Sequence, residues 1–525
     1  MNRRHFLTAT AAALAAPRLA RAQGARMLRF VPQADLSGMD PVITTRQVVR
    51  NAALLVWDTL YGVGADFVPK PQMCEGHDLS ADGKVWTFTL RPGLRFHDNE
   101  PVLTRDVVAS INRWMRGDVM GRKLQASLDA IEAVDDRVFR LRLKRPFPKL
   151  LYAFGKATTL VLAIMPERIA RTDPSRSITD YVGSGPMVFR RDEWNAGARA
   201  AFERFAGYQP RQEPADWLAG GKRMLLDRIE WITMPDPSTA AAALQQGEID
   251  WWEQPLSDLA PMLRRGRDIR VDVADLLGNV AITRMNHLYP PFNDVRVRRV
   301  IQAAVNQADY MGAVIGGDPA LWKPMPSFFT PGTPLYTEAG SEPMLALRDI
   351  DAAKRMLAAS GYAGETIILP AATDAPFVKA QAEISADLLT RLGMKIDFMA
   401  MDWGAHSTRT ASRQPPQSGG WHFSHSWVAG AECANPAAHK SLDSAGESST
   451  NGWAQSDAVQ TAIAAWFDAT DAGVERGAVD AANRAAMENV SFVPSGFFLS
   501  YTAWRRNVTG ITKAPFPVFW GVGKS

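Results

Sequence analysis

Residues 79–114 read LSADGKVWTFTLRPGLRFHDNEPVLTRDVVASINRW, and this stretch carries the clearest signals of fold class. Its first part alternates apolar and polar side chains, as a half-buried β-strand does. A Pro-Gly pair at 92–93 then predicts a turn. The last part has apolar residues at helical spacing, namely Val107, Val108, Ile111, Trp114 and Met115. The order strand, turn and helix predicts an α+β unit.

The same two periodicities recur on both sides of this stretch. Upstream they predict a strand at 28–32 and a helix from about 49 to 61. Downstream they predict strands at 139–143 and 249–252, and, further on, a helix that ends at Gly393 before a strand at 394–398. A chain of 525 residues exceeds a single core of about 250 to 300 residues. We therefore expect at least two lobes of mixed α/β construction.

The N-terminus has the features of an export signal. A twin-arginine pair, Arg3 and Arg4, precedes an apolar, alanine-rich stretch that ends in Ala-Arg-Ala. We expect cleavage after residue 22, so that the mature chain begins at Gln23. No cysteine lies near this point to carry a lipid anchor, and no later segment offers about 18 uninterrupted apolar residues. The expectation is a soluble periplasmic protein exported by the twin-arginine route.

The basic net charge comes from the signal itself. The chain has 59 Lys and Arg residues against 55 Asp and Glu, and four of the arginines lie within residues 1–22. Their removal leaves equal numbers of basic and acidic residues, so charge provides no argument for binding nucleic acid or anionic membranes. The two cysteines, Cys74 and Cys433, are predicted to be separate buried thiols, although an oxidising compartment would permit a bridge.

Six motifs in order give the chain its resemblance to a known family, the family 5 bacterial extracellular solute-binding proteins that include dipeptide-, oligopeptide- and nickel-binding components of ABC importers. The first two are 39–62 (MDPVITTRQVVRNAALLVWDTLYG) and 79–114. The others are 183–189 (GSGPMVF), 243–250 (ALQQGEID), 290–311 (PPFNDVRVRRVIQAAVNQADYM) and 351–362 (DAAKRMLAASGY). The resemblance implies a mixed α/β, two-lobed clamshell of the cluster C type, which captures a solute between its lobes and delivers it to an inner-membrane permease.

The resemblance also implies a division of the chain. Lobe I would comprise residues 23–65, 183–283 and 500–525, with an inserted α+β subdomain at 66–182, and lobe II would comprise 284–499. The first crossing between lobes is expected around Ala281 to Asn286, and the return near Phe497 to Thr502. Closure of the lobes around a ligand would shift the population toward the form that the permease recognises. The protein is expected to be a monomer.

In peptide-binding members, an Asp shortly after a Trp on lobe II pairs with the ligand ammonium. Here the segment runs from Trp427 to Pro436 and the expected Asp is missing; Glu432 is a displaced alternative. This departure weakens the expectation of plain dipeptide recognition. Asp35 matches an acid near the ligand in some oligopeptide binders, but it can equally be a loop acid that caps a turn. The full set of candidate ligand-binding residues is Asp35, Met39, Tyr61, Trp252, Met285, Trp403, Arg409, Trp427, Ala429, Glu432 and Asn435.

Other ligands and other classes stay open at this point. The ligand could be an opine, a sugar or a metal chelate. Direct metal binding is not expected, because no further ligand accompanies His422 and His425 at a recognisable spacing, and no cofactor is expected. An enzyme is disfavoured by the lack of H-E-x-x-H, G-x-S-x-G and phosphate-loop motifs. A sensing protein that presents its closed form to a receptor is a further alternative.

Overall fold

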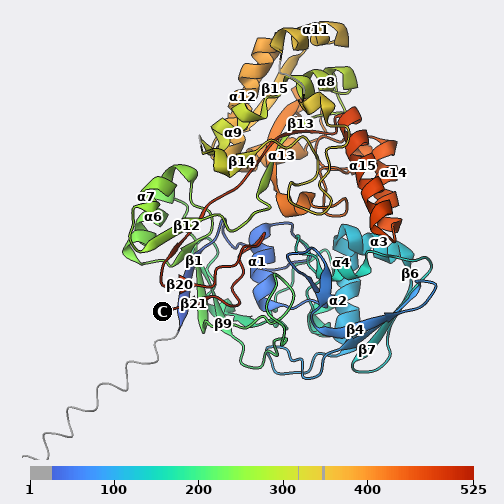
Figure 1. Cartoon of the computed structure of the whole chain (residues 1–525), viewed down its shortest axis with the longest axis vertical. Coiled ribbons are helices and arrows are strands. Elements are labelled where there is room, and N and C mark those ends of the chain that lie inside the picture. The colour runs from blue at the N-terminus through green and yellow to red at the C-terminus, as the bar shows by residue number, and fades with distance from the viewer. Residues whose placement is uncertain (1–25, 317, 346–348) are drawn as a thin grey trace, which may run out of the picture.

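The computed structural model describes residues 26–316, 318–345 and 349–525, and these form two lobes that lie one above the other in Figure 1. The predicted export signal at 1–22 and the mature N-terminus at Gln23 lie outside the described residues. Within the part of the chain that is described, no helix is both long and apolar enough to cross a membrane.

Lobe I is built on a seven-stranded sheet in the order β12-β19-β11-β1-β10-β9-β8. Its strands are β1 Met27–Val31, β8 Met187–Phe189, β9 Arg199–Arg204, β10 Arg228–Ile232, β11 Trp251–Trp252, β12 Ile269–Asp272 and β19 Thr502–Arg505. Its helices and short elements are α1 Gln47–Val56, α6 Pro237–Gln246, α7 Ala260–Arg264, η1 Arg191–Glu193, η2 Ser257–Leu259, and the strand pair β20 Val508–Thr509 and β21 Gly523–Lys524. Strand β1 pairs in parallel with β10 and β11, so the N-terminal strand is central to the lobe.

The subdomain beside lobe I contains the stretch that decided the fold class. Its sheet has the order β4-β5-β7-β6, with β4 Cys74–Leu79, β5 Val85–Leu90, β6 Leu128–Ala133 and β7 Val138–Leu143. Its other elements are α2 Thr104–Gly117, α3 Val119–Ser127, α4 Leu150–Gly155, α5 Glu167–Ala170, β2 Tyr61–Val63 and β3 Pro69–Pro71. Phe88 stacks on Phe139 of the neighbouring strand with ring centroids 5.0 Å apart. The predicted alternation is therefore confirmed, because the apolar face of β5 forms the core beneath the helices.

Lobe II contains a four-stranded sheet, β14-β18-β13-β17, and a parallel pair, β15 and β16. The strands are β13 Asn279–Met285, β14 Trp322–Lys323, β15 Thr366–Ala372, β16 Lys395–Met401, β17 Phe423–Ala429 and β18 Val493–Phe498. The α-helices are α8 Val295–Ala304, α9 Gln307–Ile315, α10 Glu342–Leu345, α11 Ile350–Ser360, α12 Pro376–Leu392, α13 Trp403–Ala411, α14 Asp457–Asp468 and α15 Ala472–Asn489. The 3-10 helices are η3 Pro319–Leu321, η4 Pro416–Ser418, η5 Gly430–Cys433 and η6 Gly446–Ser448. Helix α12 ends at Gly393, which has a left-handed backbone as predicted.

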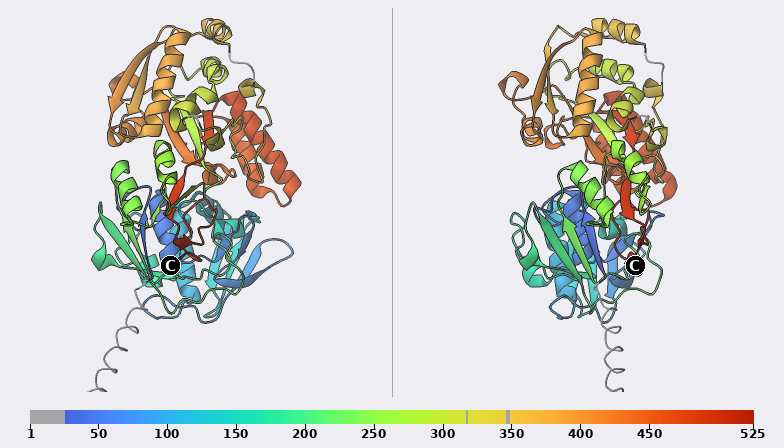
Figure 2. Two further views of the ribbon diagram at one scale, coloured as in Figure 1. Left: turned by 60° about the vertical axis from the view of Figure 1, so that its left-hand side comes forward. Right: turned by 90° about the vertical axis from the view of Figure 1, so that its left-hand side faces the viewer.

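Two segments connect the lobes, and Figure 2 shows them close together between the two bodies. The first is 273–278, between β12 of lobe I and β13 of lobe II, and the return is 499–501, between β18 and β19. The return segment falls among residues Phe497 to Thr502, the stretch suggested from the sequence for this crossing. The first crossing lies before the stretch around Ala281 to Asn286, because β13 pairs along its length with β17 and so belongs to lobe II.

One helix is shorter than its apolar spacing predicts. The pattern from Val49 to Leu60 predicts a helix to about residue 61, but α1 ends at Val56. Asp58 lies in a buried ion pair with Lys222, Oδ1 to Nζ 2.7 Å, and residues 61–63 form strand β2. The tertiary partners of Asp58 and of the strand therefore override the helical pattern.

Candidate functional site

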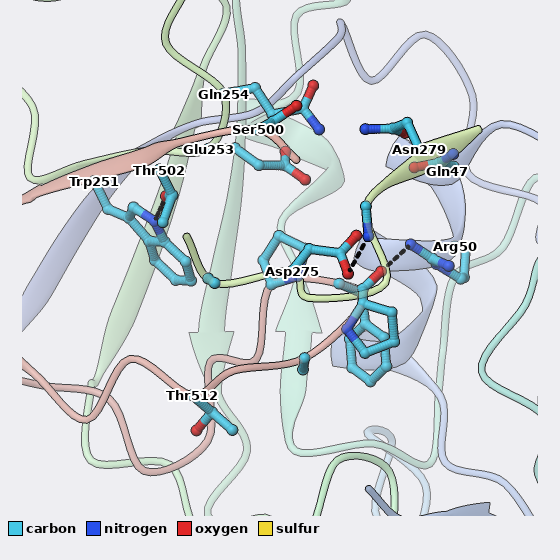
Figure 3. A pocket seen from close by; sticks show the side chains of 16 residues that line it. Gln47, Arg50, Trp251, Glu253, Gln254, Asp275, Asn279, Ser500, Thr502 and Thr512 are labelled. Atoms are coloured by element: carbon cyan, nitrogen blue, oxygen red, sulfur yellow. Dashed lines mark hydrogen bonds between the residues drawn. The ribbon is translucent and has the colours of Figure 1, made fainter. Parts of the chain in front are cut away.

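A pocket with walls from both lobes lies at the crossing segments (Figure 3). Its walls come from the start of α1, the end of β11, the first crossing, the beginning of β13, the return crossing and the C-terminal loop. The residues labelled in Figure 3 are Gln47, Arg50, Trp251, Glu253, Gln254, Asp275, Asn279, Ser500, Thr502 and Thr512. Because both crossing segments contribute walls, through Asp275, Gly278 and Ser500, a change in the angle between the lobes would change this pocket.

Arg50 of α1 is a fixed wall of the pocket. Its side chain is buried, and its guanidinium donates to Asn51 Oδ1 at 3.0 and 2.9 Å, to the Ala157 carbonyl at 3.0 Å and to the Pro515 carbonyl at 3.4 Å. Burial lowers the pKa of Arg50, and the carboxylates of Glu432, Glu253 and Asp275 oppose that effect. The guanidinium thus lies among three acids while its hydrogen bonds go to neutral oxygens.

Two of these acids line the pocket itself. Glu253, just after β11, accepts from the Gln33 backbone N–H at 2.7 Å, and Asp275, in the first crossing, accepts from the backbone N–H groups of Leu277 at 2.8 Å and Gly278 at 3.1 Å. Burial raises the pKa of each carboxyl to about 7, and Arg50 offsets only part of this rise. A buried carboxylate without a cation is costly, and these two hold their protons near neutral pH.

Glu432 is the third acid, and it comes from lobe II. It lies in η5, directly after β17, and accepts from Thr159 Oγ1 of the subdomain region at 3.2 Å. Burial raises the pKa of Glu432, opposed first by Arg50 and then by Lys440. The η5 loop is held against the first crossing, since Gly430 donates its N–H to the Gly278 carbonyl at 2.7 Å. Glu432 therefore lies at the boundary between the lobes.

Further contacts join the lobes away from the pocket. Asn435 Nδ2 donates to the Tyr152 hydroxyl at 2.6 Å. Lys149 of the subdomain region donates to the Ala469 carbonyl at 2.9 Å and forms an ion pair with Glu475 of α15. These contacts join the subdomain to lobe II, so they would break if the two lobes moved apart.

Three predicted residues lie at or beside the lobe boundary. Glu432 and Asn435 contact the opposite side directly. Ala429, the last residue of β17, is buried and pairs with Asn279, which lines the pocket. All three belong to the segment after Trp427.

The other candidates on lobe I and in the cores are used for packing or turns. Asp35 accepts from the Gly197 N–H at 2.9 Å and from Thr233 Oγ1 at 3.0 Å, so it ties turns together. The remainder are buried in hydrophobic cores, namely Met39 in lobe I, Tyr61 in the subdomain, Met285 in lobe II and Trp252 under α6. The adjacent residue Trp251 lines the pocket instead, because successive strand residues face opposite ways.

The remaining candidates lie elsewhere on lobe II. Trp403 is 45% exposed and stacks on His406, Arg409 donates to the Pro416 carbonyl at 3.4 Å, and Trp427 is partly buried against the lobe II core. His422 accepts from the Ile368 N–H through Nδ1, while His425 lies beside Thr283 in the interior. Across the described residues, no three His, Cys, Asp or Glu side chains gather as a metal site. Cys74 and Cys433 are separate buried thiols.

Sequence reasoning missed most of the pocket. Arg50 comes from the N-terminal region, Glu253 follows β11, and Asp275 and Asn279 lie close together at the first crossing. Arg50 falls in an apolar helix, where a lone arginine carries no signal of its own. One signal was available: Glu253 directly follows strand β11 and Asp275 lies in the loop after β12, and loops that follow strands often carry ligand-binding groups.

The two lobes, their paired crossings and the charged pocket between them define a clamshell solute-binding protein. Comparison with known proteins agrees with this class. The model of the bacterial extracellular solute-binding proteins, family 5 (middle part), matches residues 68–432. The probable peptide ABC transporter periplasmic-binding protein y4tO of Sinorhizobium fredii is 32% identical over 98% of each chain.

The chain therefore belongs to family 5 of the bacterial extracellular solute-binding proteins, as its motifs predict. Solved structures confirm the predicted two-lobed mixed α/β fold. The Helicobacter pylori protein DppA, in complex with the peptide STSA, superposes with a TM-score of 0.78 at 23% identity, covering 95% of this chain and 98% of that one. The protein AgaA of A. tumefaciens R10, in complex with agropinic acid, gives 0.77 at 20% identity, covering 95% and 99%.

Proposed function

We propose that this protein is the periplasmic substrate-binding component of an ABC importer, and that it captures a small peptide-like solute with a free ammonium group. The observation that carries the proposal is the placement of Glu432, a carboxylate with no ion-pair partner among the described residues, at the boundary between the lobes. The name of the Sinorhizobium relative supports a peptide-like ligand.

Glu432 has the properties that ammonium recognition requires. Its carboxylate accepts one neutral hydrogen bond, from Thr159, and burial penalises its charge. A ligand ammonium would supply a direct ion pair, which Glu432 lacks among the described residues, and up to three donors. Because Glu432 comes from lobe II and Thr159 from the opposite side, ligand bound here would contact both lobes only when they are closed.

The test compares peptides that differ only at the N-terminus. Calorimetry would measure the binding of free and N-acetylated forms of the same short peptide to wild type and to Glu432→Gln. A charged hydrogen bond contributes about 1.5–3 kcal/mol, so the variant should lose roughly 10- to 150-fold in affinity for the free peptide. Glu383→Gln, an exposed change on α12, is the matched control and should bind as wild type does. Equal binding of both peptide forms by wild type would refute ammonium recognition.

The ligand class has a separate test. Native mass spectrometry of protein purified from its own periplasm would identify a solute retained in the cleft. A peptide-like mass supports the proposal, whereas an opine, a sugar or a metal chelate would replace the peptide while leaving the receptor role intact. Loss of uptake of the identified solute on deletion of the gene would support transport over sensing.

We also propose a division of the chain and a motion. The two lobe boundaries are moved by a few residues from those expected from the sequence, since β13 pairs within lobe II and β18 ends at Phe498: lobe I would comprise 23–65, 183–278 and 499–525, with the subdomain at 66–182 and lobe II at 279–498. The lobes would rotate about residues 273–278 and 499–501. Small-angle scattering should then report a smaller radius of gyration on addition of ligand.

Export, assembly and lack of turnover complete the proposal. We expect the mature protein to begin at Gln23 after twin-arginine export, to carry no lipid anchor, to be a monomer and to bind its ligand without chemical change. N-terminal sequencing, light scattering and mass analysis of recovered ligand test these points one by one. Replacement of Arg3 and Arg4 by Lys should leave the protein in the cytoplasm, and an unaffected periplasmic level would overturn the export route.

A further inference from the structure

The hinge end of the pocket holds two carboxylates that ammonium recognition at Glu432 does not use. Glu253 comes from lobe I, just after β11, and Asp275 comes from the first crossing. Figure 3 shows their carboxylate ends pointing into the same space, with Arg50 on the other side of Asp275. The electrostatic effect of Asp275 on Glu253 agrees with this, since it opposes ionisation of Glu253.

Neither carboxylate has a cationic partner among the described residues. Glu253 accepts only from the Gln33 N–H at 2.7 Å and from Asn51 Nδ2 at 3.4 Å, and Asp275 accepts only from two backbone N–H groups in its own turn. Arg50, which acts electrostatically on both acids, directs its donors to Asn51 and to carbonyl groups, and no ion pair within the described residues joins it to either acid. The pocket therefore has two acidic groups that no protein cation neutralises by an ion pair within the described residues.

A neutral group beside the acids also lacks a partner. Asn279, the first residue of β13, lines the pocket and is only 6% exposed. Within the described part of the chain, no hydrogen bond involves its side-chain amide, which is therefore free to bind a ligand in the pocket. The amide carbonyl is an acceptor of the kind that an N–H donor would fill.

We propose that Glu253, Asp275 and Asn279 form a subsite for a second cationic group of the ligand, a primary ammonium or a guanidinium at the end of a flexible chain. A lysine- or arginine-like side chain of a peptide-like solute has this chemistry. This inference rests on the proposed function, because Arg50 interacts with Glu253 and Asp275 on one side and with Glu432 on the other, so that one ligand could reach both places. It narrows the ligand to one that carries two positive groups.

Charge and proton binding support this assignment. Burial raises the pKa of Glu253 and of Asp275 to about 7, so the empty subsite carries protons near neutral pH. The other charged groups that face them are Arg50 of α1 and, beyond it, Glu432 of η5. A bound cation favours the ionised acids, so binding should release protons, and affinity should fall as the pH drops below about 7.

The experiment measures binding of the dipeptides Ala-Arg, Ala-Lys and Ala-Leu by calorimetry, to ligand-free wild type, Glu253→Gln, Asp275→Asn and the double variant. Wild type should bind Ala-Arg or Ala-Lys at least tenfold more tightly than Ala-Leu. The variants should lose that preference and keep the affinity for Ala-Leu. Glu248→Gln, an exposed change five residues before Glu253, is the matched control and should retain the preference.

Two further measurements keep the inference separate from the proposed function. Agmatine and putrescine, which are cations without a peptide group, enter the same assay; if they bind and the dipeptides do not, the subsite stands and the peptide-like class fails. Calorimetry of wild type in buffers of different ionisation enthalpy reports proton release without any variant. Equal affinity for Ala-Arg and Ala-Leu, retention of the preference in the double variant, or failure of all these cations to bind overturns the subsite.

Discussion

Replacement of Glu253 by Gln should change the way stability depends on pH in the ligand-free protein. In the unfolded chain Glu253 titrates at its ordinary pKa of 4.5, and in the folded protein burial raises this pKa to about 7. Between these values the folded state holds a proton that the unfolded state has lost. The stability that this proton contributes is fully present below pH 4.5 and is lost as the pH rises through 7.

The magnitude follows from the two pKa values. One pKa unit corresponds to about 1.4 kcal/mol, so the rise from 4.5 to about 7 has an upper limit of about 3 kcal/mol. Glu253 retains some exposure in the pocket, which reduces the penalty, and we expect about 1–3 kcal/mol. Glutamine keeps the hydrogen bond from the Gln33 N–H but cannot ionise. The variant should therefore be more stable than wild type at alkaline pH and similar to it at acidic pH.

The assay is urea unfolding of ligand-free protein at pH 5.0 and 8.5, followed by tryptophan fluorescence. Trp251, which lines the same pocket, makes lobe I visible to this probe. Wild type should lose about 1–3 kcal/mol more than Glu253→Gln between the two pH values, and Glu248→Gln should behave as wild type does. If Glu253→Gln and wild type lose the same free energy, the carboxyl ionises without penalty and the reasoning about its burial is refuted.

Three other substitutions test the structure. Lys222→Met should destabilise lobe I by about 3–5 kcal/mol in denaturant unfolding, because it leaves the Asp58 charge buried and unpaired; a loss below 1 kcal/mol would contradict the buried ion pair. Lys149→Met removes the contact with Glu475 between the lobes, and we expect roughly tenfold weaker binding of the native ligand by calorimetry with little change in the melting temperature; unchanged affinity would show that this contact does not favour closure. Gly430→Ala would place a Cβ 1.7 Å from the backbone oxygen of the first crossing, so lobe II should be destabilised and ligand affinity lowered; a variant with wild-type melting and binding would disprove the close approach.

The buried polar groups explain which parts of the chain resisted prediction. Apolar periodicity correctly indicates β5, β7 and α12, because a strand or helix that buries one face displays it within a single window of sequence. The end of α1 does not follow its own pattern, since Asp58 is held by Lys222, which lies more than 160 residues away. No local window contains that partner.

The candidate site shows the same limit. The segment after Trp427 is expected to approach the ligand from its resemblance to peptide-binding relatives, and Glu432 lies at the lobe boundary in the loop that follows strand β17. Trp252 and Met39 are aromatic and apolar residues of the kind that line pockets, but each is buried in a core. Composition cannot separate these uses, since a core and a pocket wall select the same side chains.

The sequence by itself determined the family, the mixed α/β lobes and most of the element types, because these depend on local periodicity and on motifs in a fixed order. It also showed that basic and acidic residues are equal in number once residues 1–22 are removed. Only the tertiary structure decided that Arg50, Glu253, Asp275 and Asn279 meet at the crossings, and that Trp251 rather than Trp252 faces them. The physical reason is that burial and electrostatic interaction depend on distance in space. Nothing in the sequence distinguishes Glu253 and Asp275 from ordinary surface acids. Their pKa values are raised only because the folded protein buries them.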